Sequence, residues 1–297
     1  MPASQNESVG FIGLGVMGEP MCRNLSARSG RRVIAYDLDP APLGRLAADG
    51  VLAASSLAEI AGTASVIFLS LPGGPQVEAV LRGANGLMAH GRAGQTIVDT
   101  STSPVDLDRA LAAELAALGI DFADAPVART RQAAQDGTLS ITVGASPQVF
   151  ARIQPLLACM GSDVLHCGPV GCGQVVKLMN NMVLFQTVAA LAEAMAIGAG
   201  SGVDEALLLR ALGNGSADSF ALRNHGLKAM LPRVFPESAF PTDYAIKDAT
   251  YGLALAESAG IEAPGAKQTL RTLRRASEAG MGAQYFPALL RVVAGEV

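Results

Sequence analysis

The chain has 297 residues, of which half are hydrophobic, and its formal net charge is −4. This length suggests about two domains. The mildly acidic balance, without any run of basic residues, argues against a nucleic-acid-binding protein. The four cysteines form no CxxC pair and have no clustered histidines, which favours reduced thiols and no metal site.

Two segments bear on whether the protein is exported or inserted in a membrane. Residues 1–8 contain no basic segment followed by an apolar one, so we expect no signal peptide and a cytoplasmic protein. The apolar stretch at residues 182–199 is interrupted by Gln186, Thr187 and Glu193. We therefore expect a core or subunit-interface helix there instead of a membrane span.

The first predicted strand leads directly into a glycine-rich turn. Residues 9–12 form a short apolar run, a helical segment to about residue 29 follows the turn, and between them lies the motif Gly13-Leu14-Gly15-Val16-Met17-Gly18. In a G-x-G-x-x-G motif the first glycine permits the turn, the second lets a pyrophosphate approach, and the third lets the helix pack closely. All six residues are predicted to bind a dinucleotide at the helix N-terminus.

An acidic residue ends the second predicted strand, residues 32–36. Asp37 lies about 20 residues after the glycines, where a carboxylate binds the ribose hydroxyls of adenosine. It would repel a 2′-phosphate, and no arginine follows it directly. Asp37 therefore favours NAD, with NADP less favoured. The alternative is a turn or N-cap residue before Pro40.

Strands and helices then alternate to about residue 160. Further strands are predicted at residues 51–53, 65–71, 96–99 and 120–124, with an edge strand at 139–143. Helices are predicted at residues 41–49, 57–61, from 75, 104–118 and 147–160. Ser103 and Pro104 are expected as N-cap and first residue of the helix that ends near 118. This alternation predicts an α/β fold with a doubly wound parallel sheet in residues 1–168.

The carboxyl ends of these strands are expected to line one crevice, since ligands bind there in such sheets. Leu71, Pro72 and Thr102 are predicted to contact the dinucleotide. Ser101 and Thr102 are also predicted to hold the acid group of a substrate or the nicotinamide.

Residues 169–297 are predicted to form a second, all-α domain that opens with a long helix over residues 174–199. Lys177 and Asn181 lie four residues apart in its first turns, so they share one face. An ammonium and an amide placed side by side can bind a substrate oxygen and move a proton to it. The alternative is a lysine that extends to water and an amide that binds neighbouring loops.

Four segments, in chain order, resemble the β-hydroxyacid dehydrogenase family, the type of 3-hydroxyisobutyrate dehydrogenase and tartronate semialdehyde reductase. They are residues 11–21 (FIGLGVMGEPM), 124–127 (DAPV), 171–181 (GCGQVVKLMNN) and 247–248 (KD). The resemblance implies an N-terminal Rossmann domain, a helical domain, a homodimer or homotetramer, and reversible oxidation of a small 3-hydroxy acid. It further implies that Lys177 is catalytic, that Asn181 holds the substrate, and that Lys247 lies by the cofactor.

The substrate segment departs from the family pattern after Val127. The family continues Ser-Gly-Gly, whereas this chain continues Ala128-Arg129-Thr130. We expect Val127 and these three residues to bind substrate. The Arg129 guanidinium is suited to a bidentate anion, and the variant resembles the sulfolactaldehyde reductase branch. The alternative is a surface arginine.

The predicted activity is hydride transfer between NAD(H) and a small anionic 3-hydroxy acid or semialdehyde, 3-hydroxyisobutyrate-like or 3-sulfolactaldehyde-like, with Lys177 as general acid and base. One alternative is an NADPH-preferring reductase of tartronate semialdehyde, glyoxylate or succinic semialdehyde. An alternative of another class is a non-catalytic dinucleotide-binding sensor. Imine reductases usually lack a lysine at this position, and decarboxylating phosphogluconate enzymes need a longer helical domain.

Overall fold

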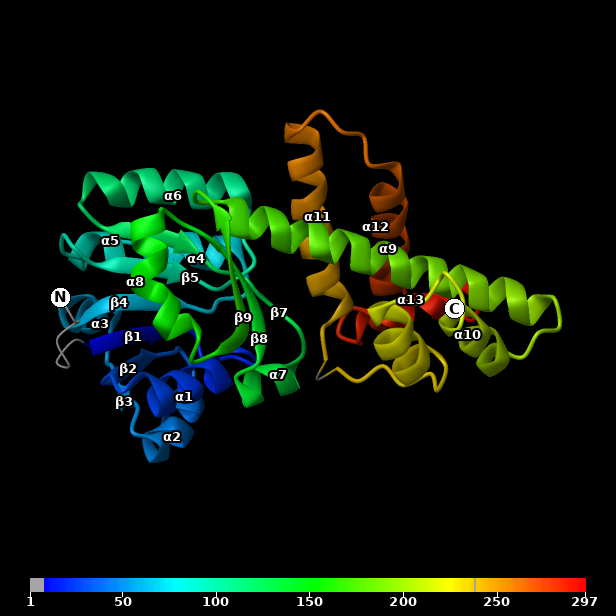
Figure 1. Cartoon of the computed structure of the whole chain (residues 1–297), viewed down its shortest axis with the longest axis horizontal. Helices are drawn as coiled ribbons and strands as arrows, with labels where there is room; N and C mark the ends of the chain where they lie inside the picture. Colours follow the sequence, from blue (N-terminus) through cyan, green and yellow to red (C-terminus); the bar gives the residue numbers. More distant parts are fainter. Residues whose placement is uncertain (1–7, 238) are drawn as a thin grey trace. The chain divides into compact units, whose positions relative to one another are not determined.

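The computed structural model describes residues 8–237 and 239–297 (Figure 1). Residues 1–7, on which the expectation about a signal peptide mainly rests, lie outside this range. The chain divides into two compact units, the first ending at Lys177 and the second spanning Leu178–Val297. The sequence pattern placed this division at 168/169, whereas in the structure one continuous helix, α9 (Cys172–Gly200), contains the division.

The first unit is an α/β sheet with helices. Its strands are β1 (Ser8–Ile12), β2 (Val33–Tyr36), β3 (Leu52–Ala53), β4 (Ala64–Leu69), β5 (Thr96–Asp99), β6 (Asp121–Asp124), β7 (Val127–Ala128), β8 (Leu139–Gly144) and β9 (Gly161–Gly168). Its helices are α1 (Gly18–Ser29), α2 (Pro40–Leu46), η1 (Ala47–Asp49), α3 (Leu57–Thr63), α4 (Gly74–Arg82), α5 (Leu87–His90), α6 (Val105–Ala117), α7 (Arg131–Asp136) and α8 (Pro147–Leu157).

The sheet order is β3-β2-β1-β4-β5-β6-β8-β7, with β9 paired to β8. The six strands from β3 to β6 are parallel, in the order of a doubly wound dinucleotide-binding sheet. The predicted parallel α/β fold is therefore confirmed.

Three local features of this unit differ from the prediction. Strand β8 is not an edge strand, because β6 and β7 pair with it antiparallel on one side and β9 pairs with it on the other. Strand β9 was not predicted, since its half-exposed side chains lack a continuous apolar run. Ser103 does not cap α6, whose N-cap is Pro104 without a side-chain bond.

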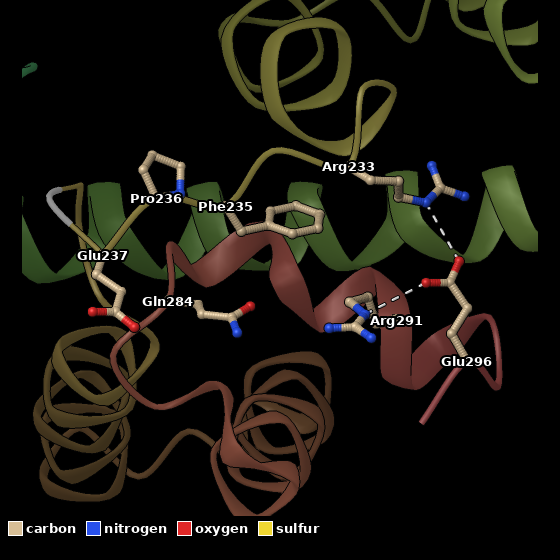
Figure 2. Close-up of a pocket in the computed structure, with 7 residues that line it drawn as sticks. All are labelled: Arg233, Phe235, Pro236, Glu237, Gln284, Arg291 and Glu296. Carbon is tan, nitrogen blue, oxygen red and sulfur yellow. Dashed lines mark hydrogen bonds and ion pairs between the residues drawn. The ribbon is translucent and has the colours of Figure 1, made fainter.

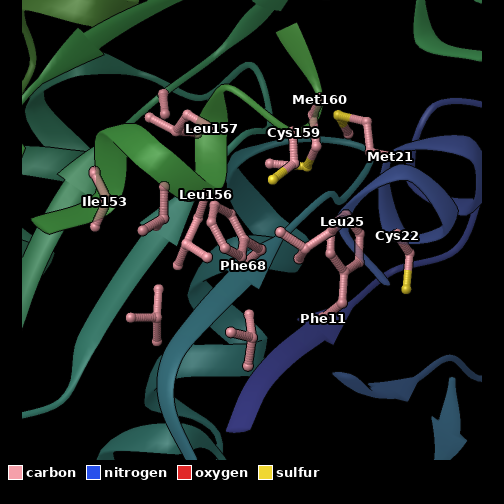
Figure 3. Close-up of a cluster of buried hydrophobic side chains, with 14 of the residues drawn as sticks. Phe11, Met21, Cys22, Leu25, Phe68, Ile153, Leu156, Leu157, Cys159 and Met160 are labelled. Atoms are coloured by element: carbon pink, nitrogen blue, oxygen red, sulfur yellow. The ribbon is translucent and has the colours of Figure 1, made fainter. Parts of the chain in front are cut away.

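Successive side chains of the parallel strands point to opposite faces of the sheet, so they pack into two separate hydrophobic clusters. Phe11 of β1 and Phe68 of β4 lie in one cluster with residues of α1 and α8, and their rings stack at 6.1 Å (Figure 3). Ile12 and Leu69, their neighbours in sequence, lie in the other cluster with residues of α3, α4 and α6. Both faces of the sheet are therefore covered, which leaves its carboxyl ends as the place for ligands.

The second unit is helical. Beyond the part of α9 that it contains, it is built from α10 (Glu205–Gly213), η2 (Leu222–Met230), α11 (Thr242–Ser258), α12 (Pro264–Ala276), η3 (Ser277–Met281), η4 (Phe286–Ala288) and α13 (Leu289–Val293). One face of α9 supplies Phe185, Val188 and Met195 to the core of this unit.

A second face of α9 is apolar and exposed. Val183 is 60% exposed and Ile197 is 68% exposed. Within the described part of the chain α9 is the single helix long and apolar enough to span a membrane by length and composition, and 28% of its most apolar window is buried. The helix therefore carries more apolar surface than its own chain covers.

Candidate functional site

The glycine loop has the geometry that its motif predicts. Gly13 adopts a φ of +92°, and a Cβ there would lie 2.2 Å from the Ser70 carbonyl oxygen. A Cβ on Gly18 would lie 2.0 Å from the Gly13 carbonyl oxygen, whereas a Cβ on Gly15 would meet nothing within 4 Å. The loop thus needs glycine for its turn and for helix packing, and it leaves open space at Gly15. This arrangement fits a dinucleotide pyrophosphate at the N-terminus of α1.

Asp37 follows β2 and reaches back to the glycine loop. Its Oδ2 accepts a hydrogen bond from the Leu14 amide at 2.5 Å, and its Oδ1 accepts one from the Asp39 amide at 2.8 Å. The N-cap of α2 is Asp39. Asp37 is half-buried beside the loop. Its carboxylate is therefore fixed against the glycine loop by backbone contacts.

The loops after β4 and β5 are joined to each other. The Leu71 amide donates to Ser101 Oγ at 2.9 Å, and the Ser101 amide donates to Asp99 Oδ1 at 2.9 Å. Ser101 is buried and Thr102 is half-buried. Leu71 is half-buried and Pro72 is exposed. Ser101, a predicted substrate residue of the loop after β5, thus holds Leu71, a predicted cofactor residue of the loop after β4.

Asp124, the last residue of β6, caps the N-terminus of α9. Its Oδ1 accepts from the Gly171 amide at 2.6 Å and its Oδ2 accepts from the Gln174 amide at 2.8 Å. Two of the orphan N–H groups of the helix are satisfied by one carboxylate from another element. Asp124 begins the predicted substrate segment, but in the structure its side chain holds the helix that carries Lys177.

The two glycines before Lys177 are explained by this cap. Gly171 has a φ of +93°, a left-handed conformation that favours glycine. A Cβ on Gly173 would lie 2.5 Å from the Thr142 carbonyl oxygen and 2.7 Å from Asp124 Oδ2. The G-x-G of residues 171–173 is therefore required for the close approach of α9 to β6 and β8.

Three carboxyl groups are buried together near the start of α9, namely Asp99, Asp108 and Asp124. Burial raises the pKa of Asp124 to about 6, against the effect of the two amides that it accepts from. Burial, with the charges of Asp99 and Asp124, also raises the pKa of Asp108 well above its usual range. Sequence reasoning missed Asp108, although it lies on the apolar stripe of α6 with Val105, Leu111 and Leu115.

Lys177 is half-buried on α9, one turn before Asn181 on the same helix. In the second unit, Asn181 Nδ2 donates to Asp248 Oδ2 at 2.8 Å, and Asn180 Nδ2 donates to Asn181 Oδ1 at 3.1 Å. Because a carboxylate only accepts, this bond fixes which way the Asn181 amide points. Asp248, not predicted as a site residue, is thus the partner that orients Asn181.

The carboxylate of Asp248 also pairs with Lys247. Its Nζ lies 2.7 Å from Asp248 Oδ1, and 4.9 Å from the centroid of the Tyr251 ring. Asp248 is 2% exposed, so its charge is balanced by a near neighbour instead of by water. Asn181, Asp248 and Lys247 therefore form one polar group within the helical unit.

The residues after β6 belong to the first unit. Val127 and Ala128 form β7, and Thr130 caps α7 by accepting from the Ala133 amide at 3.3 Å. Arg129 is exposed, with a φ of +87°, and its Nη1 donates to Thr138 O at 2.5 Å and Ser162 Oγ at 2.9 Å. In the structure this guanidinium therefore rests beside the neighbouring strands β8 and β9.

A cavity of about 620 Å³ opens in the second unit and contains none of the predicted site residues (Figure 2). Three of its charged groups are paired: Glu296 lies 3.3 Å from Arg233 Nε and 3.6 Å from Arg291 Nε. It is lined by Arg233, Phe235, Pro236, Glu237, Gln284, Arg291 and Glu296. This cavity is therefore separate from the predicted site residues.

Comparison with known proteins shows which family the chain resembles over both units. Residues 8–168 match the NAD binding domain of 6-phosphogluconate dehydrogenase, and residues 171–293 match the NAD-binding domain of NADP-dependent 3-hydroxyisobutyrate dehydrogenase. The chain is 34% identical to 2-(hydroxymethyl)glutarate dehydrogenase of Eubacterium barkeri, covering 96% of this chain and 94% of the relative. It is 36% identical to 3-hydroxyisobutyrate dehydrogenase of Pseudomonas aeruginosa, covering 86% of each.

Solved structures agree with these matches. A 3-hydroxyisobutyrate dehydrogenase from Salmonella typhimurium superposes with a TM-score of 0.85 at 26% identity, covering 97% of this chain and all of that one. The glycine loop, the sheet order, the capped start of α9 and these matches lead to one conclusion. The chain belongs to the β-hydroxyacid dehydrogenase family, oxidoreductases that act on hydroxy acids with a nicotinamide dinucleotide.

Proposed function

We propose that the enzyme interconverts a small 3-hydroxy acid and its semialdehyde, and that Lys177 is its general acid and base. The observation that carries this proposal is the position of Lys177 near the start of α9, behind the cap from Asp124 and one turn before Asn181. A lysine held on a rigid helix start, with an oriented amide next to it, suits proton transfer at a substrate oxygen.

In the oxidation direction Lys177 Nζ takes the proton of the substrate hydroxyl, and in reduction it returns a proton to the forming alkoxide. Asn181, oriented by Asp248, holds the same oxygen. Ser101 and Thr102 hold the acid group of the substrate. The bound dinucleotide supplies the hydride chemistry at its nicotinamide ring.

The proposed cofactor preference is for NAD. A carboxylate at Asp37 accepts hydrogen bonds from ribose hydroxyls and repels a 2′-phosphate. The contact of Asp37 with the Leu14 amide keeps this carboxylate at the glycine loop. We therefore expect kcat/KM to be higher with NADH than with NADPH, and Asp37→Ala to reduce the ratio of these two values. An unchanged ratio would contradict the role of Asp37.

The substrate proposal has two forms, which differ in the anion. The guanidinium of Arg129, in place of the glycine of the family pattern, favours a sulfonate such as that of 3-sulfolactaldehyde. The names of the relatives, among them a 2-hydroxy-3-oxopropionate reductase of Escherichia coli at 35% identity, favour a carboxylate.

The two forms are separated by measuring NADH oxidation with two semialdehydes, one ending in carboxylate and one in sulfonate. A higher kcat/KM for the sulfonate, lost in Arg129→Ala, supports the first form. A higher value for the carboxylate, unchanged in that variant, supports the second. Turnover of neither, with NADH still bound, favours a dinucleotide-binding sensor and contradicts the proposal.

We also propose that a second copy of the chain covers the exposed apolar face of α9. Val183 and Ile197 lie on this face, and a contiguous apolar surface of this kind is typical of a protein–protein interface. A homodimer or a homotetramer built on the helical unit would bury this surface.

A further inference from the structure

A single glutamine joins the start of α9 to the loop after β5. Gln174 Nε2 donates to the Ser101 carbonyl oxygen at 2.9 Å and to Ser103 Oγ at 3.0 Å. Its Oε1 accepts from the Ser103 amide at 3.4 Å. Gln174 and Ser103 are fully buried. One side chain thus holds the loop of Ser101 and Thr102 against the first turn of the helix that carries Lys177.

The hydroxyl of Ser103 lies between two carboxyl groups. Its Oγ lies 2.9 Å from Asp99 Oδ2 and 2.8 Å from Asp108 Oδ1. A serine hydroxyl has one hydrogen and two acceptor positions, and Gln174 already occupies one of these positions. Ser103 therefore donates to only one carboxyl group, and the other must carry a proton and donate to Ser103.

The hydrogen bonds of the two carboxyl groups indicate which of them keeps the proton, because Asp99 Oδ1 also accepts from the Ser101 amide at 2.9 Å, which favours an ionised Asp99. Asp108 of α6 is buried and faces the acidic side chains of Asp99, from the end of β5, and Asp124, from the end of β6, while the neutral side chains of Ser103 and Gln174 have a smaller, opposite effect on its pKa. These surroundings raise the pKa of Asp108 well above its usual range. Among the described residues no group hydrogen-bonds Asp108 Oδ2, which is less costly for a neutral acid than for a carboxylate.

We propose that Gln174 is a positioning residue for the reaction, and that a neutral Asp108 donates to Ser103 so that the connection through Gln174 holds. The order of donation is Asp108 to Ser103 and Ser103 to Asp99, with Gln174 donating to Ser103 and Ser101. Ser101 Oγ in turn accepts from the Leu71 amide. This proposal rests on the proposed role of Lys177, since Gln174 acts by fixing where Lys177 lies relative to the loop.

The first test is Gln174→Met, which keeps the length of the side chain and removes its hydrogen bonds. The expected result is a fall in kcat of about 10- to 100-fold, because small displacements of catalytic groups have effects of this size. The change in the NADH dissociation constant should be much smaller than the change in kcat, since the glycine loop is untouched. Gln186→Met is the control, because Gln186 lies further along the same helix and donates to the Met182 carbonyl oxygen of that helix. A kcat equal to that of the control overturns the positioning role.

The second test addresses the proton and does not depend on activity. At pH 8 the infrared spectrum of the wild-type enzyme should contain the C=O band of a protonated carboxyl group, and Asp108→Asn should lack it. A wild-type spectrum without this band overturns the assignment. This result does not change if Lys177 fails as the catalytic residue, so the two proposals can fail separately.

The pH profile links the two tests. The amide introduced by Asp108→Asn donates to Ser103 as the neutral acid does. This variant should therefore keep kcat within about twofold, and its kcat should fall at alkaline pH no more steeply than that of the wild-type enzyme, since both keep Lys177 as the acid. Asp108→Ala, which removes the donor, should lose kcat as Gln174→Met does. Equal losses in both Asp108 variants, with NADH binding intact, would contradict the role of a neutral donor.

Discussion

The backbone of Arg129 is the clearest local departure from ordinary geometry in the site. A φ of +87° is left-handed, and a side chain there is strained by about 1 to 3 kcal/mol. The family pattern places glycine at this position, where the same conformation is unstrained. The strained conformation is held in part by the contacts of the guanidinium with Thr138 and Ser162, and the role of Arg129 in selecting the anion stays a proposal.

Replacing Arg129 separates strain from function. Arg129→Ala and Arg129→Gly both lose the contacts to Thr138 and Ser162, but only glycine relieves the strain. We expect Arg129→Gly to unfold with a free energy about 1 kcal/mol higher than Arg129→Ala in urea titrations. Both variants should lose kcat/KM for the sulfonate equally. A higher unfolding free energy for Arg129→Ala than for Arg129→Gly would show that the backbone is not strained at this position.

At the scale of elements, the start of α9 depends on the close approach of three segments. Gly173→Ala would place a Cβ within 2.7 Å of both Thr142 O and Asp124 Oδ2. We expect a loss of more than about 2 kcal/mol in unfolding free energy, because backbone and a capping carboxylate must move. Gly200→Ala, near the other end of α9, meets nothing within 4 Å and should be neutral or stabilising. Equal effects in the two variants would show that the cap is unimportant.

A second element, the π-helix η2, contains a buried histidine that predicts a pH dependence. Tyr285 Oη lies 2.5 Å from His225 Nδ1, and burial lowers the pKa of His225 from 6.5 to about 4. Between these values the unfolded chain binds a proton that the folded chain does not, so stability falls as pH falls. We expect His225 to contribute a loss of about 2 kcal/mol between pH 7.5 and pH 5. In the double variant His225→Phe/Tyr285→Phe, the loss of unfolding free energy between pH 7.5 and pH 5 should be smaller by this amount. The same loss in the variant and the wild-type enzyme would exclude His225 as its source.

The sequence pattern predicts the elements whose residues are apolar and periodic, and it fails where contacts come from distant segments. Short apolar runs predict β1 to β6, and the long apolar run predicts α9. Strand β9 is stabilised by pairing with β8, which no local pattern reveals. Ser103 has the local pattern of an N-cap, yet Asp99, Asp108 and Gln174 compete for its hydroxyl.

The same distinction applies to the site. The glycine loop and its strand are contiguous in sequence, so Gly13, Gly15 and Gly18 could be predicted with their conformational reasons. The position of Lys177 on a helix follows from local pattern as well. That Asp124 caps α9, and that Asp248 orients Asn181, depends on residues 47 to 67 positions apart. Only the folded structure brings these groups together.

At the scale of the whole molecule, the exposed apolar face of α9 predicts an oligomer. Val183→Glu/Ile197→Glu places two charges on this face without touching the core of the helical unit. We expect light scattering to show a dimer or tetramer for the wild-type enzyme and a smaller species for the variant, because burying unpaired charges is costly. A monomeric wild-type enzyme at micromolar concentration would contradict the proposed interface.

The central claim is that Lys177 moves the proton in a nicotinamide-dependent oxidation of a hydroxy acid. The most direct measurement compares Lys177→Ala with the wild-type enzyme in single-turnover NADH oxidation, using a semialdehyde that the wild-type enzyme reduces. Lys228→Ala, an exposed lysine of the second unit, is the control. The account predicts a rate lower by about 10²- to 10⁴-fold for Lys177→Ala, with the NADH dissociation constant unchanged. A rate equal to that of the control would contradict it.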